Sequence, residues 1–146
     1  MMVQASNLDA IRTTLSAAKA AYVRDLAATD AVPVAGTDVN PAGAAFSPDG
    51  RWLAFYSLDR LVKVPVSGGA PITVSTEPAP AWSVRWSDND TLLYASYRGI
   101  SRVSANGGAP QVIVKRKGIE LLDPGQLLPG GRAVLFSWRS SGQRYE

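Results

Sequence analysis

The sequence contains no cysteine and no histidine among its 146 residues. Without cysteine the chain can form no disulfide framework and has no thiolate nucleophile. Without histidine it can hold no Ser-His-Asp triad, and the usual zinc ligand sets are excluded as well. We therefore expect a protein that is not an enzyme and that carries no cofactor and no metal site.

Charge and long apolar runs are also scarce. Charged residues make up 18% of the chain and the formal net charge is +3, against 46% hydrophobic residues. This balance is typical of one soluble globular domain. No run approaches the roughly 18 apolar residues of a membrane span. Asp9, Arg12 and Lys19 interrupt the beginning of the chain, so we expect no signal peptide there.

Two short phrases recur at a nearly constant spacing. The first reads FSPDG at residue 46, WSDND at 86 and LLPGG at 127, each time before an apolar run. The second reads VSGGAP at 66 and ANGGAP at 105, and a weaker copy of the preceding segment stands at 22–34. Two independent phrases with a period of about 40 residues indicate tandem structural units.

Both phrases have the chemistry of chain reversals. Pro48 fixes its own φ and Asp49-Gly50 supplies turn residues, so the first phrase predicts a turn between two strands. Gly68-Gly69 and Gly107-Gly108 predict a second hairpin in each unit.

The strands between these turns differ in their patterns. The run at 52–57 is apolar at nearly every position, and 92–95 and 133–136 repeat this habit. A strand with one wet face alternates, so we expect these three to be covered on both faces. The next strand, at 61–66, does alternate. Pro65 cannot donate to a ladder, which favours a sheet edge for this strand.

These patterns predict an all-β fold. Small antiparallel sheets stacked face to face around an axis form a β-propeller with four-stranded blades. A β-sandwich is the alternative, but it gives no reason for a repeated phrase. We expect about three blades in an incomplete ring over 22–146, with units near 22–43, 44–81, 82–123 and 124–146.

Residues 1–21 predict a short N-terminal helical segment. Ser6 is a suitable N-cap, and the alanine-rich stretch that follows places Leu8, Ile11 and Leu15 at helical spacing. Such a helix packs on an exposed blade edge or forms a frayed tail; the alternative is that it binds a partner or lies on a membrane surface.

The phrase AAFSPDGRWLAFYS, followed by LVKVPVSGGAP, resembles the Trp-Asp-like propeller repeat of bacterial TolB-type proteins. The resemblance covers about residues 22–138 and is clearest at 44–75. Similar repeats occur in propeller caps of prolyl-oligopeptidase-like peptidases and behind bacterial serine/threonine kinase domains. The segment YVRDLAATDAVPV at 22–34 is most similar to the kinase-attached group.

The resemblance implies a non-catalytic binding module that presents loops to a protein or a small ligand. The alternative is an accessory or sensor propeller of such a kinase or peptidase, whose chemistry would lie on other residues. A third possibility, a propeller enzyme acting through its channel, lacks a convergent acid/base set in this sequence. Many relatives are periplasmic, whereas the chain as written carries no export signal and fits the cytoplasm.

Relatives close a full ring of blades, and the sequence departs from them. It begins after the inner strands of its first unit and stops before the outer strands of its last. Two interpretations follow. Either the chain is a piece of a longer propeller protein, or two copies self-associate so that 22–34 of one completes the blade begun at 127–138 of the other.

An aromatic residue followed by arginine recurs just after the apolar strands. Tyr97-Arg98 and Trp138-Arg139 occupy the same repeat position, and the first unit departs from it with Arg60. Stacking faces and cations gathered on one rim suit a carboxylate, a peptide or a glycan. We expect a protein or peptide partner there; the alternative is that these side chains only shield strand ends.

Two other charged groups indicate no site. Lys115-Arg116-Lys117 has no interleaved aromatics, so it predicts a solvated loop and no nucleic-acid partner. Asp49, Asp88 and Asp90 match no calcium-binding loop, and turn chemistry explains them better.

Overall fold

A computed structural model describes residues 20–57, 59–78, 83–118 and 120–139. In this part of the chain twelve strands form four antiparallel sheets, and no helix is present. The all-β prediction is therefore confirmed. The helix predicted for 1–21 lies outside the described residues, except for Ala20 and Ala21.

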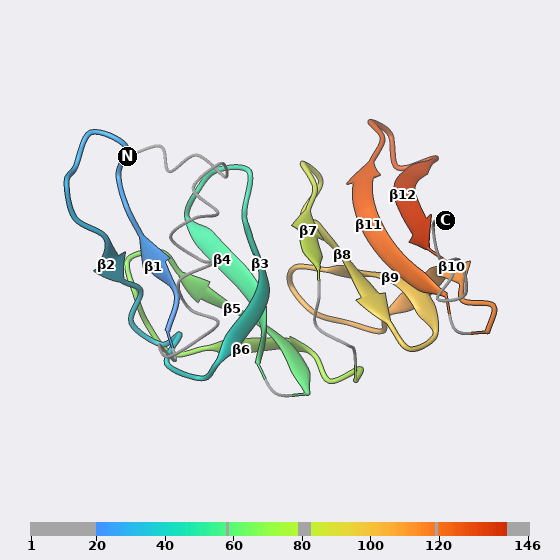
Figure 1. The fold of residues 1–146 in the computed structure, drawn as a ribbon, viewed down its shortest axis with the longest axis horizontal. Coiled ribbons are helices and arrows are strands. Elements are labelled where there is room, and N and C mark those ends of the chain that lie inside the picture. The colour runs from blue at the N-terminus through green and yellow to red at the C-terminus, as the bar shows by residue number, and fades with distance from the viewer. Residues whose placement is uncertain (1–19, 58, 79–82, 119, 140–146) are drawn as a thin grey trace, which may run out of the picture.

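Two four-stranded sheets share one plan, in which the strand order follows the chain. The 41–75 sheet consists of β3 (Pro41–Phe46), β4 (Trp52–Ser57), β5 (Arg60–Pro65) and β6 (Ile72–Ser75). The 84–115 sheet consists of β7 (Val84–Trp86), β8 (Thr91–Ser96), β9 (Gly99–Ser104) and β10 (Gln111–Lys115). The repeated phrases thus correspond to repeated sheets (Figure 1).

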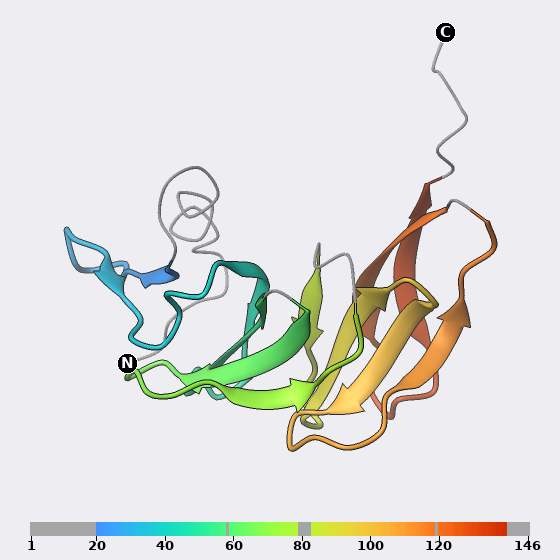
Figure 2. The ribbon, with the colours of Figure 1, turned by 90° about the horizontal axis from the view of Figure 1, so that it is seen from below.

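A two-stranded hairpin lies at each end of this pair of sheets. The 22–33 hairpin joins β1 (Tyr22–Val23) to β2 (Val32–Pro33), and the 121–139 hairpin joins β11 (Leu121–Leu127) to β12 (Val134–Arg139). Figure 2 shows the four sheets following one another in chain order as a fan. This is the stacked arrangement that the repeat predicts.

Strand β4 is covered on both faces, as predicted. Leu53 and Phe55 pack with Val34 and other side chains around the 22–33 hairpin. Ala54 and Tyr56, which alternate with them, pack against the 84–115 sheet. Successive side chains of a strand point to opposite faces, so one short segment contributes to two cores. Strand β8 has the same burial pattern as β4.

The edge position predicted for the 61–66 strand is wrong. Strand β5 pairs with β4 on one side and with β6 on the other, so it lies inside the sheet. Pro65 is tolerated because the pairing with β6 ends at Lys63, opposite Ile72. Its missing N–H therefore removes no ladder bond on that side.

The coverage predicted for 133–136 is not supplied by the described residues of this chain. Leu135 and Phe136 are 63% and 38% exposed. Among the described residues no further sheet packs over the outer face of the 121–139 hairpin, so the apolar residues of β12 remain accessible (Figure 2).

The turn chemistry of the first phrase is present as predicted. The Ser47 hydroxyl donates to Asp49 Oδ1 at 2.6 Å, and the Arg51 N–H donates to the same oxygen at 3.0 Å. These hydrogen bonds, with the nearby Arg51 charge, lower the pKa of Asp49. In the next unit Ser87 donates to Asn89 Oδ1 at 2.7 Å. Both acidic phrases therefore close turns between strands.

Candidate functional site

The equivalent strands β4, β8 and β12 run in the same direction through the fan and end at one rim (Figure 1). Tyr97 and Arg98 lie there, directly after the end of β8. Arg116 joins the same rim, because its N–H donates to the Arg98 carbonyl oxygen at 2.9 Å. We call this set of strand ends and connections the rim.

The structure places the predicted site residues in different surroundings. Tyr97 and Trp138 are 63% and 57% exposed. Arg60 pairs with its neighbour Asp59, whose Oδ1 lies 3.3 Å from Nε. Arg98 pairs with a carboxylate between two sheets, and Arg139 lines a cavity. Arg98 and Arg139 thus belong to adjacent features of the rim, whereas Arg60 stays with its own turn.

The cavity lies between the 84–115 sheet and the 121–139 hairpin and has a volume of about 390 Å³. Three arginines line it: Arg85 on β7, Arg116 after β10, and Arg139 at the end of β12. Glu120 and Asp123 line it as well. Three positive charges against two negative ones leave the cavity with one positive charge.

Two of the three arginines are anchored by main-chain oxygens. Arg85 donates from one terminal nitrogen to the Val84 carbonyl at 3.1 Å, and Arg116 Nε donates to the Gly118 carbonyl at 3.0 Å. A guanidinium has five N–H donors, so most of its donors remain open after one such bond. These bonds fix the two side chains without neutralising them.

Ser83 supplies a further polar group to this cavity. Its residue is 6% exposed, and its hydroxyl has no hydrogen-bond partner within the described residues. A buried hydroxyl without a partner is costly, and most such groups in proteins are paired. One residue of the cavity wall therefore carries a buried hydroxyl whose hydrogen-bonding capacity is unused within the described residues.

Sequence reasoning missed Ser83, Arg85 and the role of Arg116. Lys115 and Lys117 are exposed, as a solvated loop predicts, whereas Arg116 is half-buried in the cavity wall. Nothing in the repeat marks Ser83 or Arg85. Their meeting depends on how one sheet stacks on the next, which a single sequence does not display.

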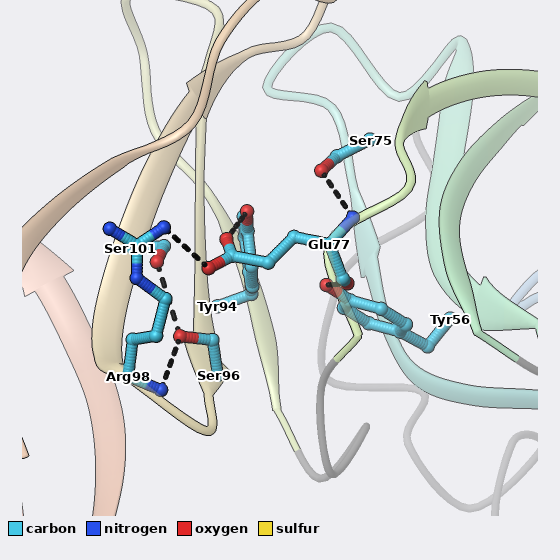
Figure 3. A network of polar contacts seen from close by, with 7 residues as sticks. All are labelled: Tyr56, Ser75, Glu77, Tyr94, Ser96, Arg98 and Ser101. Carbon is cyan, nitrogen blue, oxygen red and sulfur yellow. Dashed lines mark hydrogen bonds and ion pairs between the residues drawn. The ribbon is translucent and has the colours of Figure 1, made fainter.

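A polar network joins the 41–75 sheet to the 84–115 sheet beside the rim (Figure 3). The Tyr94 hydroxyl donates to Glu77 Oε2 at 2.5 Å, and the Tyr56 hydroxyl donates to the Glu77 carbonyl at 3.2 Å. The Glu77 N–H donates to Ser75 Oγ at 3.1 Å. On the rim side, Arg98 lies 3.6 Å from Glu77 Oε1. Glu77 therefore connects two sheets and holds Arg98.

Burial raises the pKa of both tyrosine hydroxyls in this network. For Tyr94 the hydrogen bond to the Glu77 carboxylate adds to burial, since it stabilises the neutral phenol. For Tyr56 the neighbouring Tyr94 and Glu77 charges add to it. The two rings also meet edge to face, with centroids 5.7 Å apart.

Replacing Tyr94 with phenylalanine should lower the free energy of unfolding by about 1 to 3 kcal/mol, because a largely buried carboxylate oxygen loses its donor. Urea unfolding at neutral pH measures this. The control is Tyr97→Phe, whose side chain is exposed and whose effect should stay within about 0.5 kcal/mol. Equal losses in the two variants would contradict the role of the network.

The stabilities of the parent chain and of Tyr94→Phe should also respond differently to alkaline pH. The pKa of Tyr94 is raised in the folded state, so its contribution is complete below the unfolded value of about 10 and declines as the pH rises towards the folded pKa. The parent chain should therefore lose more stability than Tyr94→Phe between about pH 8 and pH 11. A stability difference that stays constant over this range would overturn the assignment.

Two further classes of site are missing from the part of the chain that the structure describes. It holds no group of three or more His, Cys, Asp or Glu side chains placed to bind a metal ion. It also holds no helix with the length and hydropathy of a membrane span.

Stacked four-stranded antiparallel sheets, each covered by its neighbours, are the blades of a β-propeller. No family model matches this chain, and no curated protein matches it either. Among solved structures it is similar to TolB from Acinetobacter baumannii, with a TM-score of 0.63 and 20% sequence identity. The match covers 86% of this chain and 33% of the TolB chain, so the chain spans about a third of that structure.

The fold is therefore a TolB-like β-propeller fold, and the propeller prediction is confirmed. The resemblance to TolB-type repeats is confirmed at the level of the fold. The closer resemblance of 22–34 to the kinase-attached group stays a prediction.

Proposed function

We propose that this chain is a non-catalytic β-propeller binding module whose rim recognises a protein or peptide partner. One observation carries the proposal: Tyr97 is 63% exposed and directly follows Ser96, which lines the arginine-lined cavity. Exposed aromatic and arginine side chains are the residues that most often dominate recognition energies. Because the rim carries such side chains, it is better suited to bind a peptide than a sheet edge that lacks them.

Trp138 extends this surface. It lies between Ser137 and Arg139, which both line the cavity, and it is 57% exposed. A peptide crossing the end of β12 would contact the indole beside the cavity.

The proposal predicts peptide binding that depends on Tyr97. Panning a library of random displayed peptides against the chain should select binders, and Tyr97→Ala should weaken them by about tenfold or more, the size of a hot-spot loss. Ile72→Ala is the matched control, because Ile72 is also an exposed apolar side chain but lies on β6. Calorimetry measures both affinities. Selected peptides that bind Tyr97→Ala as tightly as the parent would refute the proposal.

The accessory function remains the alternative proposal. A kinase or peptidase domain on the same polypeptide would then be the partner of the rim. The sequence resemblance of 22–34 to the kinase-attached group favours this alternative. Reading the neighbouring reading frame for such a domain distinguishes the two proposals.

A second copy is the partner proposed for the outer face of the 121–139 hairpin. Leu135 on β12 is 63% exposed, and 22–34 of another copy is the segment expected to pair beside this strand. Light scattering decides the matter, because a strictly monomeric folded chain excludes ring closure by self-association.

A further inference from the structure

We propose that the cavity between the 84–115 sheet and the 121–139 hairpin is a binding subsite for a single carboxylate group. The carboxylate belongs either to a peptide or to a small organic acid. In the peptide case the inference rests on the proposed function and names the group that the rim selects. In the case of a small organic acid, the inference is independent of the proposed function.

The first support is the convergence of three guanidinium groups from separate elements. Arg85, Arg116 and Arg139 come from β7, from the connection after β10 and from the end of β12. Within the described residues none of them forms an ion pair with Glu120 or Asp123. A planar guanidinium can donate two parallel hydrogen bonds to one carboxylate. The arginines of the cavity have N–H donors that can bind a carboxylate in this way.

The second and independent support is Ser83. Ser83 lines the cavity and is 6% exposed, and its buried hydroxyl has no hydrogen-bond partner in the described part of the chain. A ligand oxygen held by the arginines would accept a hydrogen bond from this hydroxyl. The otherwise unexplained buried group then has a function.

Charge selects a carboxylate over a phosphate. With three arginines and two acids in its wall, the cavity carries one positive charge, which a carboxylate neutralises. A phosphate group carries about −1.5 to −2 at neutral pH on one phosphorus centre and would leave an excess of negative charge beside Glu120 and Asp123. The second carboxylate of a dicarboxylic acid stands several bonds away from the first, where solvent screens it. The two acids therefore discriminate against the more highly charged group.

Size and wall chemistry indicate what stands behind the carboxylate. A volume of about 390 Å³ falls at the lower end of the range for small-ligand sites, about 300 to 1,000 Å³. Ala95, Leu121 and Leu122 add apolar wall to the arginines. The site thus suits a carboxylate with a short carbon chain, such as one amino-acid residue or a small dicarboxylic acid.

The test titrates the whole chain with four probes: acetyl-Ala-Leu as the free acid, the same dipeptide as its amide, glutarate, and inorganic phosphate. Calorimetry or NMR shifts give the affinities. The free acid, glutarate or both should bind at least tenfold more tightly than the amide and phosphate, since charged hydrogen bonds carry the difference. Binding of the dipeptide acid alone identifies a peptide source, and binding of glutarate alone identifies a small acid.

Three variants locate the binding. Arg139→Gln and Arg116→Gln should each weaken the bound acid about tenfold, and Ser83→Ala about threefold. Arg132→Gln is the matched control, because it removes the same charge from an exposed arginine outside the cavity. It should leave the affinity unchanged. Thermal unfolding of each variant verifies that the fold persists.

Three results would overturn the inference: equal binding of acid and amide, phosphate binding as tight as carboxylate binding, or equal losses in Arg139→Gln and Arg132→Gln. The last would indicate only diffuse attraction by positive charge. Tyr97-dependent peptides without any preference for a carboxylate would reject this inference and leave the proposed function standing. Glutarate binding without any selected peptide would do the reverse.

Discussion

Replacing Phe55 with alanine should lower the free energy of unfolding by about 3 to 5 kcal/mol, the range for removing a buried aromatic ring. Phe55 is 0% exposed and belongs to the core that joins β4 to the 22–33 hairpin, with Leu53 and Val34. The loss combines the removed apolar contacts with a cavity that a closely packed core cannot fill. Urea unfolding measures it.

The control is the same substitution at Phe136, which is 38% exposed on β12. We expect a smaller loss of about 1 to 2 kcal/mol there, because the partly exposed ring gives up less buried surface and leaves no enclosed cavity. Equal losses at the two positions would show that the 22–33 hairpin does not form a core with β4.

Replacing Gly99 with alanine should cost about 3 kcal/mol or more and should abolish carboxylate binding. Gly99 has a φ of 135°, and a Cβ built on it would lie 1.9 Å from the Val114 carbonyl oxygen and 2.8 Å from the Arg116 nitrogen. A positive φ alone costs about 1 to 3 kcal/mol for other residues. The backbone contact must then be relieved by moving β10 and Arg116 away from the cavity.

Gly108→Ala separates the effect of the steric contact made by the added Cβ from the free-energy cost of the positive φ. Gly108 has a φ of 121°, and a Cβ there meets nothing within 4 Å. Both variants therefore carry a dihedral cost, but only Gly99→Ala displaces the backbone beside the cavity. Urea unfolding and glutarate titration together measure the difference. A Gly99→Ala chain as stable as Gly108→Ala, with full binding, would contradict this account of the rim.

The repeat units could be predicted from the sequence because their signals are local. FSPDG and VSGGAP each contain the residues that their turns require. The nearly continuous apolar run at 52–57 and the apolar run at 92–95 indicate that both faces of these strands are covered. Turn chemistry and hydrophobic pattern agree, so fold class and strand order follow from short stretches of chain.

The errors arise where a residue's surroundings come from another unit. Pro65 indicated an edge, yet its partner strand simply ends before reaching it. The apolar sequence of β12 predicted that both faces of this strand are covered, which the described residues do not supply. Pattern identifies a strand that can be buried, but only the neighbouring sheet determines whether it is.

The site was predicted in part for the same reason. The position of Arg139 on the rim follows from the repeat, but its cavity partners Ser83 and Arg85 belong to another sheet. Glu77 stands in the connection between two units, and the sequence gives no sign that Tyr94 reaches it across the sheet boundary. Contacts between units depend on stacking geometry, which periodicity leaves open.

The fan arrangement also determines how the molecule responds to damage. Among the described residues, the main contacts between sheets join successive members of the series. A destabilising substitution in one sheet therefore affects its neighbour mainly through the interface between them. Glu77 stabilises one of these interfaces. In such a chain, the unfolding of one sheet affects the next sheet through the interface that they share. The stability of each interface therefore determines whether adjacent sheets unfold together or separately.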